Sequence, residues 1–146
     1  MRIGVDSSVL VAAIHANHPL HAVAVQWLVA ALKRHELVVT HHTVLECYAV
    51  LTRLPGEWRI SGDEAKRLLE GTIRNRMILA GYRPDWIWGA IEGMAERYVA
   101  GGRAYDAFVA DLLKRSGCDA IATFNAAHFS DVASEFRILD PSRPEA

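Results

Sequence analysis

The fold of this chain is decided by the stretch Ile3-Gly4-Val5-Asp6-Ser7-Ser8-Val9-Leu10-Val11. Its first three residues are apolar and indicate a short buried strand, which the polar residues Asp6, Ser7 and Ser8 end. Asp and Ser are preferred at the position that caps a helix, and the apolar run from Val9 to Ile14 continues as a short helix. The stretch therefore predicts a strand that passes directly into a helix at Asp6.

The same alternation of strands and helices continues along the chain. Apolar segments predict further strands at 37–40, 119–123 and 136–139, and the segment 77–80 is either a strand or an extended connection. Apolar residues at helical spacing predict helices that end near residue 34, cover 43–54, open after Ser61 and after Pro84, and cover 103–115. Alternating strands and helices favour one α/β domain, residues 1–146, with a central parallel sheet and helices on both faces.

Composition limits the class of protein. The chain has 146 residues, of which 51% are hydrophobic and 23% charged, as expected for a globular domain rather than a disordered one. Its net charge of -1 means that any RNA contact must come from a local basic patch. Two distant cysteines, Cys47 and Cys118, suit a reducing compartment. With neither a signal peptide nor a membrane-spanning run, we expect a cytoplasmic protein without a membrane partner.

Several polar residues fall where a parallel sheet places its ligand site. Ligands bind beyond the carboxyl ends of such strands, and Asp6 follows the first strand directly. Asp106 lies in the first turns of the helix 103–115, and Thr123 and Asn125 follow a late strand. Glu46 lies within the helix 43–54, whose other positions are so apolar that we expect this helix to be buried on most sides. Glu46 would then face either solvent or a polar cleft.

Each acid also has a purely structural explanation. Asp6 can be a helix cap, and Asp106 can complement the positive end of its helix. Glu46 can be solvated, or it can pair with Arg53 on the same polar stripe. If Arg53 does not pair with Glu46, it is a candidate contact for a phosphate group. Taken together, three clustered carboxylates favour a hard cation such as Mg²⁺ or Mn²⁺, which supports phosphodiester hydrolysis. The glycine-rich motifs of dinucleotide and nucleoside triphosphate sites are absent from the sequence.

Four segments resemble motifs of the PIN-domain family, in its VapC-type toxin branch. The first three resemble the segments that carry the acids of that family, and the fourth resembles its closing T-x-N/D-x-x-x-F motif. In chain order they are residues 5–11 (VDSSVLV), 43–46 (TVLE), 102–110 (GRAYDAFVA) and 122–129 (ATFNAAHF). The resemblance extends from about residue 3 to residue 140, nearly the whole chain.

The resemblance implies a Mg²⁺- or Mn²⁺-dependent endoribonuclease, the toxin of a type II toxin–antitoxin pair, in which water attacks the phosphorus of RNA. Carried over by position, the catalytic residues are Asp6, Glu46, Asp106 and Asn125, and the first three of these bind the metal. Ser8 and Thr123 support the site by hydrogen bonding. The implied partners are the RNA substrate, a cognate antitoxin protein and a second copy of the chain in a homodimer.

One departure leaves an alternative open. The fourth position of the family is often Asp, but Asn125 carries no charge, so metal binding is expected to be weaker. Asp119 does not replace the missing acid well, because it lies at the start of its strand and the ligand site is expected at the other end. The alternative is a catalytically weak or inactive PIN-fold module that binds RNA or protein. A dehalogenase-like phosphatase is disfavoured, because its second Asp is replaced by Ser8.

Two further features have competing explanations. The spacing of His15, His18 and His21 invites a zinc site, but Pro19 interrupts it and the sequence offers no clear fourth ligand. Trp86 and Trp88 flank an apolar stripe on the helix after Pro84, formed by Ile87, Ile91, Met94 and Tyr98. This helix is either buried in the ordinary way or forms part of an interface.

Overall fold

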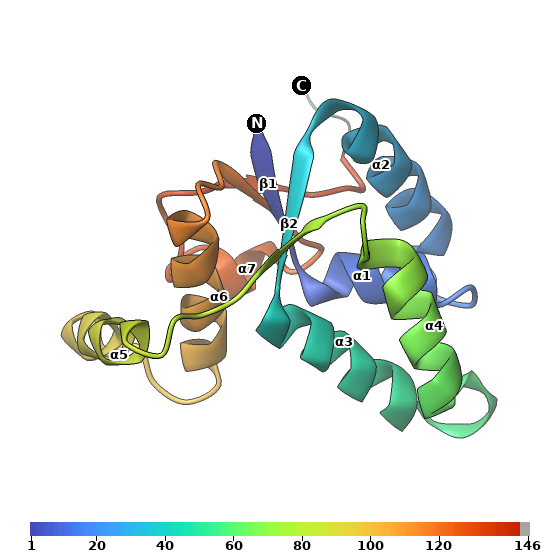
Figure 1. The fold of residues 1–146 in the computed structure, drawn as a ribbon, viewed down its shortest axis with the longest axis horizontal. Coiled ribbons are helices and arrows are strands. Elements are labelled where there is room, and N and C mark those ends of the chain that lie inside the picture. Colours follow the sequence, from blue (N-terminus) through green and yellow to red (C-terminus); the bar gives the residue numbers. More distant parts are fainter. Residues whose placement is uncertain (144–146) are drawn as a thin grey trace.

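The structure, a computed structural model, describes residues 1–143, so the last three residues of the predicted domain lie outside it (Figure 1). Five parallel strands form one sheet in the order β3-β2-β1-β4-β5. They are β1 (Arg2–Val5), β2 (Glu36–Thr40), β3 (Ile78–Ala80), β4 (Ala120–Ala122) and β5 (Arg137–Leu139). The predicted parallel α/β sheet is confirmed, and the undecided segment 77–80 contains an edge strand.

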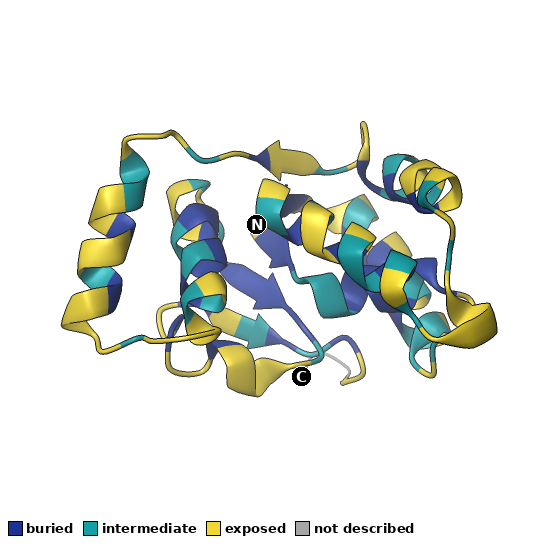
Figure 2. Cartoon of the chain, turned by 90° about the horizontal axis from the view of Figure 1, so that it is seen from below, coloured by how far each residue is buried: buried dark blue, intermediate teal, exposed yellow. Residues whose placement is uncertain are grey.

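Helices cover both faces of this sheet (Figures 1 and 2). Alternate strand residues point to opposite faces, so Leu37 and Val39 join one core cluster and Val38 joins the other. The first cluster includes residues of α1 (Ser7–Ile14), α2 (His21–Arg34), α3 (His41–Arg53) and α4 (Gly62–Ile73). The second includes residues of α5 (Trp86–Glu96), α6 (Arg103–Arg115) and α7 (Ala126–Phe129). A single 3-10 turn, Gly56–Trp58, lies between α3 and α4.

Side-chain caps fix the points where helices begin. The Asp6 carboxylate accepts a hydrogen bond from the Ser8 amide at the start of α1. Thr40 Oγ1 accepts a hydrogen bond of 3.0 Å from the Thr43 amide at the start of α3. Because both caps directly follow neighbouring strands, α1 and α3 begin at the same edge of the sheet.

The sheet and α6 make their closest approach at Gly4. A methyl group added to Gly4 would lie 2.4 Å from Leu113 Cδ1, far inside van der Waals contact. The glycine therefore lets the buried Leu113 side chain rest directly on the backbone of β1. This contact sets how close α6 lies to the centre of the sheet.

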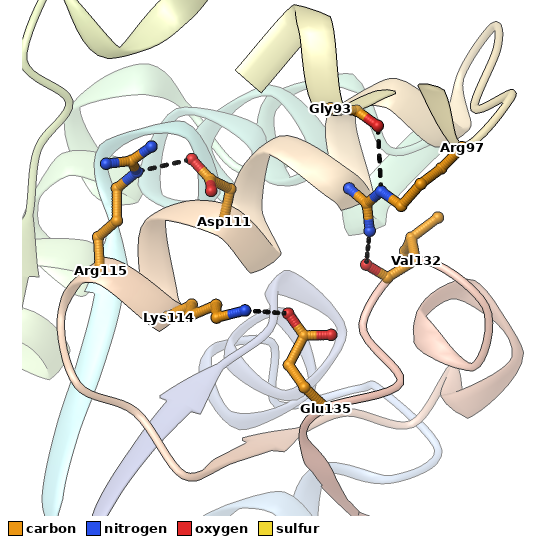
Figure 3. A network of polar contacts seen from close by, with 7 residues as sticks. All are labelled: Gly93, Arg97, Asp111, Lys114, Arg115, Val132 and Glu135. Carbon is orange, nitrogen blue, oxygen red and sulfur yellow. Dashed lines mark hydrogen bonds and ion pairs between the residues drawn. The ribbon is translucent and has the colours of Figure 1, made fainter. Parts of the chain in front are cut away.

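Polar contacts hold α5 and α6 to the C-terminal segment (Figure 3). Arg97, just after α5, donates hydrogen bonds to the carbonyl oxygens of Gly93 and Val132. Two of the ion pairs on α6 are Arg115 with Asp111 and Lys114 with Glu135. These contacts are exposed, so they orient the elements more than they stabilise the fold.

Two helices are less buried than the sequence predicts. On α3 only Thr43, Cys47 and Leu51 are buried, whereas Leu45 is 67% exposed. The expectation that α3 is buried on most sides was therefore wrong, because helices cover it on one side only.

Among the described residues, no helix is both long and apolar enough to cross a membrane.

On α5 the predicted apolar stripe does not form the inner face. The buried residues of this helix are Ala90 and Met94, whereas Ile91 is 47% exposed. Trp86 packs against the second core cluster, as the burial explanation predicts. Trp88 is 74% exposed, as the interface explanation requires, and the outer surface of α5 is visible in Figure 2.

Candidate functional site

The site begins where β1 and β4 end side by side. Val5 is paired with Ala122 in the parallel register, so the next residues, Asp6 and Thr123, leave the sheet together. The Asp6 amide donates a hydrogen bond of 3.0 Å to the Ala122 carbonyl oxygen, which extends the pairing by one step. Two residues that are 117 positions apart in the sequence are thereby placed in direct contact.

Two hydroxyl groups hold the Asp6 carboxylate. Its Oδ2 atom accepts hydrogen bonds from Ser8 Oγ at 2.7 Å and from Thr123 Oγ1 at 2.8 Å. Ser8 Oγ in turn accepts from the Phe124 amide at 3.0 Å, and Thr123 Oγ1 accepts from the Asn125 amide at 2.9 Å. Because each hydroxyl has a single proton and its lone pairs receive the amides, both protons point to Asp6.

The second oxygen of Asp6 has a different environment. Within residues 1–143, every hydrogen bond to this carboxylate ends on Oδ2, and none reaches Oδ1. Thr123 is fully buried, so its hydroxyl has no solvent to exchange with and its orientation is fixed. The arrangement orients one carboxylate oxygen with three donors, two hydroxyls and the Ser8 amide, and leaves the other for a ligand.

Asp106 and Glu46 lie close enough to Asp6 for the three charges to interact. Burial raises the pKa of the Asp106 carboxyl, the charge of His128 lowers it, and the charges of Asp6 and Glu46 raise it further. The buried Cys47 thiol shows the same proximity, because its pKa is raised first by burial and then by Glu46 and Asp6. The structure therefore brings together acids from the junction of β1 and α1, from α3 and from α6.

Glu46 has a neighbour that the sequence did not single out. Glu46 Oε2 lies 3.9 Å from His42 Nε2, one helical turn earlier on α3. The alternative in which Glu46 pairs with Arg53 is wrong, since no such contact occurs in the described chain and Arg53 is exposed. The i, i+4 spacing of His42 and Glu46 was the available signal.

His128 is a second histidine that lies near the acids. It is exposed on α7, and its charge acts on Asp106. Asn125 precedes α7 and is also exposed, with its carbonyl oxygen accepting a hydrogen bond of 2.9 Å from the His128 amide. Asp119 lies at the opposite end of β4, where it accepts a hydrogen bond from the Arg2 amide.

The site lacks a preformed metal cage. In residues 1–143, no three His, Cys, Asp or Glu side chains lie close enough to form a complete metal-binding group. The rings of His15 and His21 bond to carbonyl oxygens of Trp58 and Ala12, and His18 Nδ1 accepts from the Leu20 amide, so these three rings serve the backbone instead of a common ion.

The donor chemistry at Asp6, Glu46 and Asp106 nevertheless suits a hard cation. All three offer carboxylate oxygens, and within residues 1–143 no hydrogen-bond donor reaches Asp6 Oδ1. Burial raises the pKa of Asp106 most, and the negative charges of Asp6 and Glu46 raise it further. A divalent cation held by Asp6, Glu46 and Asp106 would offset the repulsion among their charges.

Comparisons with known proteins point to one family. A model of the PIN domain family matches residues 3–135. Ribonuclease VapC40 of Mycobacterium tuberculosis is 37% identical over 79% of this chain and 81% of its own length. The structure of M. tuberculosis VapC20, a toxin that cleaves the sarcin-ricin loop, has a TM-score of 0.68 at 17% identity and covers 88% of this chain and 93% of its own.

A chain of a second solved structure also shares the fold. The structure of VapBC2 from Rickettsia felis, bound to a DNA fragment from the promoter, has a TM-score of 0.69 at 13% identity and covers 95% of this chain and 98% of the matched chain. At such low identity the structural matches show the fold alone, whereas the family match and the VapC40 identity show kinship. The chain therefore belongs to the PIN domain family, among relatives that are VapC ribonucleases.

Proposed function

We propose that this protein is a metal-dependent endoribonuclease that hydrolyses RNA phosphodiester bonds, and that it is the toxin of a toxin–antitoxin pair. The observation that carries the proposal is the Asp6 carboxylate, oriented by two hydroxyls and placed beside the charges of Glu46 and Asp106. The kinship with VapC ribonucleases supports RNA as the substrate.

Asp6, Glu46 and Asp106 would hold Mg²⁺ or Mn²⁺ in this proposal. When bound, the ion supplies the positive charge that offsets charge developing on the phosphodiester. Ser8 and Thr123 keep the Asp6 carboxylate in one orientation, which is the role that groups behind a ligand normally have. Asn125 offers a neutral amide oxygen at the rim of the site, and His128 offers a donor to phosphate oxygens.

The proposal includes protein partners and a place in the cell. Toxin–antitoxin complexes share this fold, so we infer that a cognate antitoxin protein binds the chain and suppresses cleavage. We also propose a homodimer and a cytoplasmic location. A short neighbouring reading frame whose product forms a stable complex with the chain and stops RNA cleavage would identify the antitoxin, and a product that binds without inhibiting would contradict the inference.

RNA cleavage by the purified, antitoxin-free protein tests the enzymatic activity. We expect cleavage in Mg²⁺ or Mn²⁺, its loss with a chelator, and a fall of at least ~100-fold in Asp6→Asn, because several kcal/mol of charge stabilisation are removed. Asp119→Asn is the matched control, since it removes an exposed carboxylate at the other end of β4.

The alternative function is an inactive binding module. It remains a candidate because Asn125 is uncharged at a position that is often Asp in the family. If the wild-type protein binds RNA but cuts none with either ion, the enzymatic proposal fails and the binding module is favoured. Equal activity of Asp6→Asn and Asp119→Asn would show that cleavage comes from a contaminant or from another site.

A further inference from the structure

We propose that Tyr105, stacked on His42, is a platform that binds an unpaired nucleobase of the RNA beside the acidic site. The inference rests on the proposed function and names one feature of its substrate: a single-stranded segment at the position of cleavage. Aromatic side chains bind single-stranded RNA in this way because every base has a π-face, whatever its sequence.

The two rings form a parallel pair across the gap between two helices. The His42 and Tyr105 ring centroids lie 5.4 Å apart, and their planes differ by 6°. His42 is in the first turn of α3 and Tyr105 is in the first turn of α6, so the pair bridges the helices that carry Glu46 and Asp106. An offset parallel arrangement of this kind is favourable for two aromatic rings.

Tyr105 keeps most of its surface open. The residue is 63% exposed although one ring face lies on His42, so the opposite face is in contact with solvent. Its position in the helix is next to Asp106, a proposed metal ligand. A flat apolar surface that is supported on one side and open on the other suits a base better than it suits the core.

Partly buried aromatic rings support the platform from behind. Phe108, one turn further along α6, meets the His42 ring edge-on at 6.3 Å and stacks on Tyr82 at 4.1 Å. Tyr82 in turn meets Trp86 at 5.7 Å. The supporting side chains therefore have little freedom to move when a base is added, and a rigid platform binds with a small loss of side-chain entropy.

The platform lies within reach of the acids. His42 Nε2 is 3.9 Å from Glu46 Oε2, and the charge of His42 acts on Asp106. A base stacked on Tyr105 would therefore belong to a nucleotide that flanks the cleaved phosphodiester. Stacking does not recognise the hydrogen-bonding edge of a base, so the platform selects unpaired RNA rather than a particular base.

Binding measured apart from cleavage tests the platform. Asp6→Asn serves as a background that does not cut, and fluorescence anisotropy compares a single-stranded RNA oligomer with a ribose-phosphate oligomer of equal length without bases. We expect Tyr105→Leu to weaken binding of the RNA about 5- to 150-fold and to leave binding of the baseless oligomer unchanged. Tyr105→Phe, which keeps the ring, should bind RNA within about twofold of the background protein.

Tyr48→Leu is the matched control, because Tyr48 is also partly exposed but lies on α3 beside α4, close to Gly62. Equal RNA affinity for Tyr105→Leu and the background protein overturns the platform, and so does an equal loss for both oligomers, which indicates a structural role. Tyr105→Trp gives a second, independent measure, since its larger ring should bind RNA at least as tightly. If RNA binds as expected but the wild-type protein cuts none, the proposed activity fails and the platform stands.

Discussion

The hydroxyl of Thr123 connects three parts of the site. It donates to the Asp6 carboxylate, it accepts from the Asn125 amide, and it lies 3.3 Å from Ser8 Oγ. Removing this buried hydroxyl leaves the Asn125 amide without its acceptor and takes one donor from Asp6, which keeps only those of Ser8, so the loss exceeds the value of an average hydrogen bond. Thr123 therefore affects both the stability of the fold and the orientation of the ligand.

Replacing Thr123 by Val removes the hydroxyl at nearly constant volume. We expect the free energy of unfolding to fall by about 1–3 kcal/mol and RNA cleavage to fall ~10- to 100-fold. Thr123→Ser keeps the hydroxyl and loses one methyl group, so it should lower stability by about 1 kcal/mol and leave cleavage nearly unchanged. Chemical denaturation and cleavage rates at saturating metal measure both effects. Equal cleavage by the Val and Ser variants would contradict the orienting role.

At the scale of the element, α5 shows what periodicity cannot predict. The spacing of Ile87, Ile91 and Met94 places them near one side of a helix, but only Met94 of this predicted stripe is buried, and Tyr98 lies beyond the end of α5. The spacing does not show which side meets the protein, because α5 packs chiefly on α6 and presents both apolar directions with only one partner. The packed side contains Ala90 and Met94, and the other apolar side remains exposed at Trp88 and Ile91.

We expect the exposed side of α5 to form the proposed homodimer interface. Light scattering of the purified wild-type chain should give a dimeric mass, and Trp88→Ser should weaken the dimer by about 30-fold or more, since buried tryptophans are frequent hot spots. Leu45→Ser, on the equally exposed surface of α3, is the control and should not change the mass. A monomeric wild-type protein, or a dimer that Trp88→Ser leaves intact, would contradict this assignment.

At the scale of the whole molecule, the sheet topology explains why much of the site was predictable. Asp6 and Thr123 follow strands whose parallel order follows from alternating strands and helices, so their meeting could be expected from the sequence. The contact between His42 and Tyr105 could not, because it depends on the distance between α3 and α6 across the sheet. The orientation of Glu46 toward His42 likewise depends on side-chain rotamers that a sequence pattern leaves open.

The repulsion among the three acids predicts a measurable effect on stability. Burial, together with Asp6 and Glu46, raises the pKa of Asp106 above the ordinary 3.8, so the folded protein holds this proton more tightly than the unfolded chain does. The free energy of unfolding therefore falls as the pH rises through the raised pKa. At neutral pH and without metal, Asp106→Asn should have a higher Tm than the wild type, and this difference should shrink as the pH is lowered toward 3.8.

Added metal should make the Tm of the wild type higher than that of Asp106→Asn. Mg²⁺ or Mn²⁺ at one hundred times its Kd stabilises the wild type by about 2.7 kcal/mol, and Asp106→Asn should gain much less. Thermal unfolding with and without each ion measures both effects, with Asp119→Asn as the control that should follow the wild type. An Asp106→Asn protein that is less stable than the wild type without metal would contradict the clustering of charge.

The close approach of Leu113 to Gly4 acts as a spacer for the site. Leu113 lies two helical turns after Asp106 on the same side of α6, and Gly4 lies two residues before Asp6 on β1. A methyl group at Gly4 would have to displace the Leu113 side chain. Any shift of α6 that followed would change the distance between two proposed ligands, although the methyl group would touch neither carboxylate.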